Sequence, residues 1–172
     1  TAVTELTLDY NSLRGFVFPP GYQNLGFLSV KFNLLTEFPD VRSVGNSLRK
    51  LWLKDNRISV VDRDILDSLK VLEDIHLGNN LLKQFPDTTN PSPSLVILRL
   101  YFNLLEKMPF LPNYGKSLVQ LQIGNTPMKE LTLQDALALQ KLTKLGARNI
   151  SVSRLPNLCH AAKVDVNFVF FD

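Results

Sequence analysis

Side chains that could act as acids, bases, nucleophiles or metal ligands are few in this sequence, and their spacing does not suit such chemistry. The 172 residues include two histidines, His76 and His160, and one cysteine, Cys159. The histidines lie far apart and have no carboxylate or cysteine at ligand spacing, so we expect no metal site. Cys159 beside His160 could suggest a nucleophile, but a single cysteine is more often a buried structural residue. We therefore predict neither a metal centre nor a nucleophilic catalyst.

A second candidate for chemistry is Gly115-Lys116-Ser117, which matches the last three residues of a phosphate-binding loop. Phe110 occupies the position of the first glycine in that motif, and no strand–loop–helix pattern surrounds the segment. We interpret the match as chance. The sequence therefore predicts a protein that is not an enzyme and uses no cofactor.

The composition is that of an ordinary folded domain. Apolar residues make up 45% and charged residues 20%, and 19 Lys and Arg against 16 Asp and Glu leave a net charge of +3. This excess is too small to indicate nucleic-acid binding, which needs basic residues concentrated on one face. No stretch reaches the roughly 18 consecutive apolar residues of a membrane span. We expect neither a nucleic-acid partner nor a membrane span within this chain.

The strongest pattern in the sequence is a repeat with a period of 22 to 24 residues. Seven blocks align on the spacing LxxLxLxxNxL, the last of them loosely, and they begin at Val3, Leu25, Leu48, Leu72, Leu95, Leu118 and Leu142. The alternation within each block predicts a short strand with one buried face. Because one repeat cannot bury its leucines alone, neighbouring repeats must stack and join their strands into a parallel sheet. The expected strands are 5–8, 27–30, 50–53, 74–77, 97–100, 120–123 and 144–147.

A column of asparagines follows these strands. Its members are Asn11, Asn33, Asn56, Asn80 and Asn103. Their amides can satisfy backbone groups where the chain turns away from the strand. Thr126 takes this position in the sixth repeat, and Ile150 takes it in the seventh, with Asn149 one place early. We therefore expect an irregular turn in the seventh repeat.

The segments that return to the next strand differ from one repeat to another. Residues 62–69 and 131–140 have spaced apolar residues and N-terminal capping residues, which predict short helices. The segments 19–24, 86–94 and 109–117 are rich in Pro or Gly and are expected to be extended or single turns.

This repeat resembles the leucine-rich repeat family from about Val3 to the end of the chain. The resemblance implies an α/β repeat fold, a right-handed and curved solenoid with a parallel concave sheet and a mostly irregular convex side. We expect one domain over residues 1–172, with about seven repeats and the start of an eighth. Neither end shows the cap that such solenoids carry, so we expect a fragment. Either further sequence or a second copy would cover Phe168, Phe170 and Phe171; we favour further sequence.

The outward residues of repeats two to five are unusually apolar, aromatic and basic, and members of this family usually bind through this face. The expected ligand-binding residues are Phe27, Lys31, Lys50, Trp52, Lys54, His76, Ile97, Arg99 and Tyr101. Trp, Tyr and Arg are enriched at binding hot spots, and the lysines predict an acidic patch on a protein ligand. Lateral packing within the sheet is the alternative explanation. Tyr10, Phe32 and Phe102 are expected to pack along the rim.

The resemblance is closest to animal cell-surface leucine-rich proteins, including receptors and adhesion molecules. We therefore expect an extracellular protein-binding module. An intracellular scaffold or regulatory subunit in the cytoplasm is the alternative, which a single unpaired cysteine suits. A third reading is the substrate-recognition part of a larger enzyme, with the catalytic site outside this sequence. Asn149-Ile150-Ser151 is an open sequon, which makes Asn149 a candidate glycosylation site.

Overall fold

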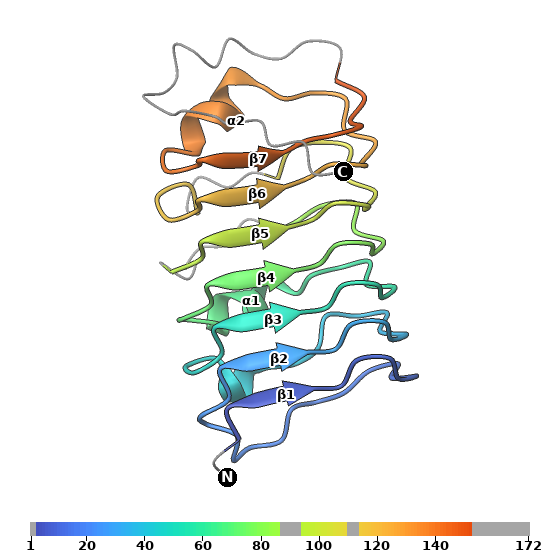
Figure 1. Ribbon diagram of the computed structural model, residues 1–172, viewed down its shortest axis with the longest axis vertical. Helices are drawn as coiled ribbons and strands as arrows, with labels where there is room; N and C mark the ends of the chain where they lie inside the picture. The colour runs from blue at the N-terminus through green and yellow to red at the C-terminus, as the bar shows by residue number, and fades with distance from the viewer. Residues whose placement is uncertain (1–2, 87–93, 110–113, 153–172) are drawn as a thin grey trace.

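The computed structural model describes residues 3–86, 94–109 and 114–152. Within them lies one seven-stranded parallel sheet in which each strand pairs with the next in sequence (Figure 1). The strands are β1 (Glu5–Thr7), β2 (Phe27–Ser29), β3 (Lys50–Trp52), β4 (Asp74–His76), β5 (Ile97–Arg99), β6 (Gln120–Gln122) and β7 (Lys144–Gly146). The predicted solenoid with one parallel sheet is confirmed.

Each strand begins at the predicted residue and ends one residue earlier than predicted. The backbone ladder nevertheless continues for one more bond, since the Leu53 N–H donates to the His76 carbonyl at 2.8 Å. The strands pair without a register shift, so that Leu51 lies opposite Ile75 and Ile75 opposite Leu98. Equivalent residues of successive repeats therefore form straight rows across the sheet.

The inward rows form the core. Leu51, Leu53, Ile75, Leu77, Leu98 and Leu100 are all fully buried, as predicted. Burying a side chain of this size contributes about 1.5–3 kcal/mol relative to leaving it exposed. Stacked repeats thus bury what a single repeat would leave in water.

The asparagine column links each repeat to the next. The Asn56 Oδ1 accepts a hydrogen bond from the Leu35 N–H at 3.0 Å, and its Nδ2 donates to the Val30 carbonyl at 2.8 Å. Asn33, Asn56, Asn80 and Asn103 are buried, whereas Asn11 in the first repeat is exposed. In the sixth repeat the Thr126 hydroxyl donates to the Ile123 carbonyl at 2.8 Å. The buried asparagines thus bond to backbone groups of the preceding repeat, whereas the Thr126 hydroxyl bonds within its own repeat.

The residue that precedes each position of the asparagine column adopts the left-handed backbone conformation. These residues are Tyr10, Phe32, Asp55, Asn79, Phe102, Asn125 and Asn149, with φ between 51 and 58°. Asn149 has φ 53°, which is the same conformation as in the other six turns. The prediction of an irregular turn in the seventh repeat is therefore wrong. The displaced asparagine occupies the one position of the turn where a left-handed residue is required, and asparagine tolerates that conformation well.

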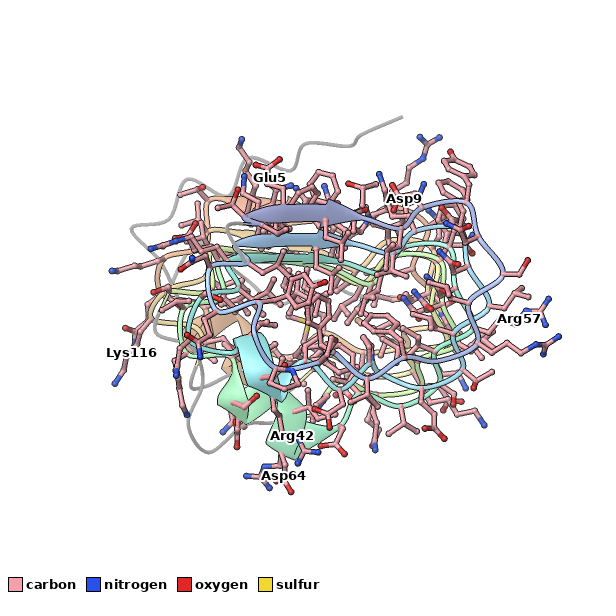
Figure 2. The ribbon with its side chains drawn as sticks, turned by 90° about the horizontal axis from the view of Figure 1, so that it is seen from below. Glu5, Asp9, Arg42, Arg57, Asp64 and Lys116 are labelled. Atoms are coloured by element: carbon pink, nitrogen blue, oxygen red, sulfur yellow. The ribbon has the colours of Figure 1, made fainter. Side chains whose placement is uncertain are left out.

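The helices lie on the side of the sheet that the core faces (Figures 1 and 2). They are the 3₁₀ helix η1 (Arg42–Val44), α1 (Arg63–Ser68) and α2 (Leu133–Ala138). The Asp62 carboxylate caps α1 by accepting from the Asp64 and Ile65 N–H groups. Before α2, the Asp135 carboxylate accepts from the Thr132 N–H at 2.7 Å, and the Thr132 hydroxyl accepts from the Asp135 N–H at 3.1 Å. Both predicted helices are confirmed, one or more residues shorter at each end, and η1 was not predicted.

Several sequence-based expectations lie outside the described residues. They concern Cys159, His160, the phenylalanines from Phe168 onward, and most of the segment 86–94. No helix in the described part of the chain is long and apolar enough to cross a membrane.

Candidate binding surface

In the described part of the chain no helix covers the outward side of the sheet (Figure 1), and we call this side the concave face. Figure 2 shows Glu5 and Asp9 on this side and Arg42 and Asp64 on the opposite one. Three positions in each repeat point outward: the first and third residues of the strand and the second residue after it. Because the strands are in register, these positions form three columns of side chains about 4.8 Å apart from strand to strand.

Four rings from successive repeats run across the concave face from β2 to just beyond β5. The Phe27 and Trp52 rings meet edge-on with centroids 4.9 Å apart. Trp52 and His76 follow at 6.3 Å, and His76 and Tyr101 at 5.5 Å. We call Phe27, Trp52, His76 and Tyr101 the aromatic row. All four side chains are half-buried, so each leaves part of its ring open to solvent.

The two polar members of the aromatic row are hydrogen-bonded to each other. The His76 Nε2 lies 2.8 Å from the Tyr101 hydroxyl oxygen. Burial, with the nearby charges of Arg99, Lys54 and Lys31, lowers the pKa of His76 to about 3. Burial also raises the pKa of Tyr101. Both groups are therefore uncharged at neutral pH, and the row presents an apolar surface with polar tips.

Asp74 holds two of the predicted binding residues in place. Its carboxylate forms an ion pair with the Arg99 guanidinium and accepts a hydrogen bond from the Trp52 indole N–H at 3.4 Å. Asp74 is only 6% exposed. The sequence prediction omitted this residue, although an acidic side chain in the outward column next to Arg99 was a usable signal.

The basic residues beside the row are partly neutralised. The Lys31 Nζ lies 3.2 Å from the Asp9 carboxylate and 5.0 Å from the centre of the Trp52 ring. The Lys54 Nζ lies 3.1 Å from the Asp55 carboxylate and 5.3 Å from the centre of the Phe32 ring. Lys50 is exposed and has no ion pair within the described residues.

Apart from Ile97, the rest of the concave face is polar or small. Ile97 is half-buried between Asp74 of β4 and Gln120 of β6. Beyond it, β6 and β7 present Gln122, Gly124, Lys144 and Gly146 in the outward columns. The aromatic side chains are thus confined to β2 through Tyr101.

The rim beside the carboxyl ends of the strands carries the aromatic residues expected there. The Tyr10 and Phe32 rings stack with centroids 4.3 Å apart. The Phe102 ring meets Tyr101 edge-on at 5.9 Å and is 53% exposed. Tyr10 and Phe32 thus pack on each other along the rim, whereas Phe102 packs on Tyr101 of the aromatic row.

The structure also describes the candidate glycosylation site. Asn149 is exposed, and its Nδ2 donates to the Asn125 Oδ1 at 3.0 Å. Among the described residues, no three His, Cys, Asp or Glu side chains come close enough together to hold a metal ion.

Comparison with known proteins defines the class. The leucine rich repeat family profile matches residues 46–105. Chicken (Gallus gallus) lumican is 32% identical over 178 residues, which cover 95% of this chain and 50% of lumican. Bovine (Bos taurus) asporin is 31% identical over 108 residues, covering 59% of this chain and 29% of asporin. The chain therefore spans half or less of the length of these two relatives.

Solved structures agree on the fold. An internalin, InlF, from Listeria monocytogenes superposes with a TM-score of 0.73 at 20% identity, covering 95% of this chain and 46% of that one. YopM from Yersinia enterocolitica superposes with a TM-score of 0.63 at 26% identity, covering 90% and 36%. The chain is a leucine-rich repeat protein.

Proposed function

We propose that this protein binds a protein ligand on its concave face, with Trp52, His76, Arg99 and Tyr101 as the main contacts. The observation that carries the proposal is the aromatic row together with the ion pair that fixes it. Aromatic and arginine side chains dominate the energetics of binding surfaces. The module has no catalytic role in this proposal, and the matches indicate no catalytic family.

Lateral packing of the rings within the sheet is the competing explanation. It accounts for the ring–ring contacts, but stability alone does not require a buried carboxylate at Asp74. A buried ion pair costs desolvation and is often no more stable than well-packed apolar residues. By contrast, holding Arg99 and Trp52 in one conformation lowers the entropy lost on binding. This preorganisation favours the binding proposal.

Substitutions on the concave face test the proposal. The partner is first isolated by affinity capture with the wild-type protein and then purified. We expect Trp52→Ala and Arg99→Ala each to weaken its binding by about 2 kcal/mol, roughly 30-fold. Gln122→Ala in the polar part of the face is the matched control and should bind as wild type. If both variants of the aromatic part bind unchanged, the ligand occupies another surface.

The charge of the partner is a second part of the proposal. Lys31, Lys50 and Lys54 favour a ligand with an acidic patch, and Lys50 contributes most because Asp9 and Asp55 offset the other two. The association rate should therefore fall as salt is added. A rate that does not depend on salt would contradict this part while leaving the aromatic contacts unaffected.

We further propose that the protein acts outside the cell, as a secreted or cell-surface receptor or adhesion protein. The likeness to lumican and asporin supports this location. Asn149 is then accessible for N-glycosylation, since it is exposed in a turn. The full-length protein expressed in animal cells should shift in mass when treated with an N-glycosidase, and Asn149→Gln should remove the part of the shift due to this site. A mature protein found only in the cytoplasm would contradict the proposal.

A further inference from the structure

The first strands of the sheet carry a notch that is lined by a glycine, Gly26. The residue just before each strand is Thr4, Gly26, Arg49, Glu73, Val96, Val119 or Thr143. Glycine stands in this column only in the second repeat. Around it the structure has an open hollow of about 400 Å³, with Gly26 flanked by Thr4 and Arg49 on the neighbouring strands.

The wall of this notch is aromatic. Phe27 and Trp52 line it, and their rings meet at 78° with centroids 4.9 Å apart. Two rings in this arrangement form an apolar corner that exposes both a ring face and a ring edge. A third aromatic ring can pack into such a corner, since aromatic pairs favour offset and edge-to-face contacts.

Opposite charges stand on the two sides of the same notch. Glu5, Phe27 and Lys50 are direct neighbours across β1, β2 and β3, so the two charged residues lie about 10 Å apart with the ring between them. Glu5 and Lys50 are both exposed, and neither forms an ion pair within the described residues. The third charged residue, Arg49, is paired with Glu73.

We propose that this notch is an anchor pocket for a tyrosine side chain of the protein ligand. The inference rests on the proposed function and names the residue that the first three strands recognise. A tyrosine ring fills the apolar corner between Phe27 and Trp52. Its hydroxyl can donate to the Glu5 carboxylate or accept from the Lys50 ammonium group, so it matches a pocket with a charge of each sign.

Other side chains fit the pocket less well. A lysine or arginine of the ligand would approach Lys50 and Arg49, which carry the same charge. A carboxylate would approach Glu5. Phenylalanine fills the aromatic corner but offers no hydrogen bond to either charged residue. A neutral aromatic side chain with a polar tip fills the aromatic corner and can hydrogen-bond to Glu5 or to Lys50 without placing a like charge beside either.

A small probe tests the pocket without the partner. Trp52 is the only tryptophan of the chain, so its fluorescence reports on the surroundings of this one side chain, which lines the notch. N-acetyl-L-tyrosinamide, titrated with excitation that tyrosine does not absorb, should change the emission saturably, with a dissociation constant on the order of 1 mM. N-acetyl-L-phenylalaninamide should bind several-fold more weakly, and N-acetyl-L-lysinamide should cause no saturable change. Equal responses to all three probes would overturn the proposal.

Filling the notch gives a sharper test. A Cβ at Gly26 would meet only the Thr4 and Ser47 carbonyl oxygens, at 3.7 and 3.9 Å, which are ordinary contacts. Gly26→Val should therefore fold and weaken binding of N-acetyl-L-tyrosinamide at least about tenfold. Gly15→Val is the matched control, since Gly15 has no atom within 4 Å of its Cβ position and does not line the notch. Equal thermal unfolding of the two variants verifies that the fold is retained.

The outcomes separate this inference from the proposed function. If Gly26→Val binds the probe as tightly as wild type, the pocket is wrong even where Arg99→Ala still weakens the partner. If the wild type binds the probe and Gly26→Val does not, but Arg99→Ala and Gly26→Val both bind the purified partner unchanged, the pocket exists and its role in partner binding is overturned.

Discussion

The two parts of the concave face share one backbone and carry different chemistry. From β2 to Tyr101, the outward columns hold four packed rings, a buried carboxylate and its arginine partner. Over β6 and β7 the same columns hold Gln120, Gln122, Gly124 and Gly146. Strand pairing and inward leucines do not change between the two parts: Leu98 of β5 lies opposite Leu121 of β6, and both are fully buried.

This difference shows that the fold restricts the inward positions and leaves the outward ones free. The core needs an apolar residue of suitable size at each inward position, because a void or a polar group there costs stability. The outward residues meet solvent and one another, so their types can follow function. The following predictions test how far this separation holds, from the largest expected effect to the smallest.

The inward positions should be equally important in both parts. Leu98→Ala and Leu121→Ala should each lower the free energy of unfolding by about 3 kcal/mol, through lost burial and the cavity left behind. Urea unfolding followed by circular dichroism measures both. A loss at Leu121 several times smaller than the loss at Leu98 would mean that the two parts do not share one continuous core.

Asp74 and Gln120 occupy the same outward column on either side of Ile97. Asp74→Ala removes the acceptor for the Arg99 guanidinium and the Trp52 indole, and we expect it to lower the free energy of unfolding by about 2 kcal/mol. Gln120→Ala should change it by less than about 0.5 kcal/mol. If urea unfolding gave the same loss of stability for both variants, the ion pair of Asp74 would not make the aromatic part of the concave face different from the polar part.

Gly78 and Gly124 share another outward column and face different neighbours. A Cβ at Gly124 would lie 2.8 Å from the Arg148 carbonyl oxygen, whereas one at Gly78 would lie 2.7 Å from the Tyr101 ring. A backbone atom cannot move as easily as a ring, so we expect Gly124→Ala to cost about 2 kcal/mol and Gly78→Ala about 1 kcal/mol. Thermal unfolding ranks the two, and the reverse order would contradict the packing described for Tyr101.

The aromatic part should also make stability depend on pH. The pKa of folded His76 is about 3 against 6.5 for the unfolded residue, so the unfolded state binds the proton between these values. Stability therefore falls as the pH drops below 6.5, by up to about 1.4 kcal/mol per pH unit. Urea unfolding between about pH 5 and about pH 7 measures this slope. His76→Gln is the control and should have a smaller slope; an unchanged slope would assign the effect to other groups.

Much of the architecture could be predicted from the sequence because it repeats. The spacing of the leucines gave the first residue of every strand, and the asparagine column gave the turns, since every repeat faces the same packing requirement. The predicted helices 62–69 and 131–140 followed from local capping residues such as Asp62. The prediction for the turn at Asn149 was wrong because it considered only the asparagine column. It did not consider that the residue just before this column must adopt the left-handed conformation, which Asn149 does.

The sequence by itself determined the inward rows, the order of the outward columns and the confinement of the aromatic members of these columns to repeats two to five. Each of these depends only on residue type and on a repeat period that recurs along the whole chain. Only the tertiary structure decided which outward residues touch: that Asp74 holds Arg99 and Trp52, that Asp9 and Asp55 neutralise two lysines, and that Gly26 opens a notch between its neighbours. Except for Lys54 and Asp55, which are adjacent in sequence, these contacts join residues more than twenty positions apart. They depend on side-chain conformations that stacking selects. A repeat pattern predicts which residues share a column, but side-chain packing determines which of them are in contact.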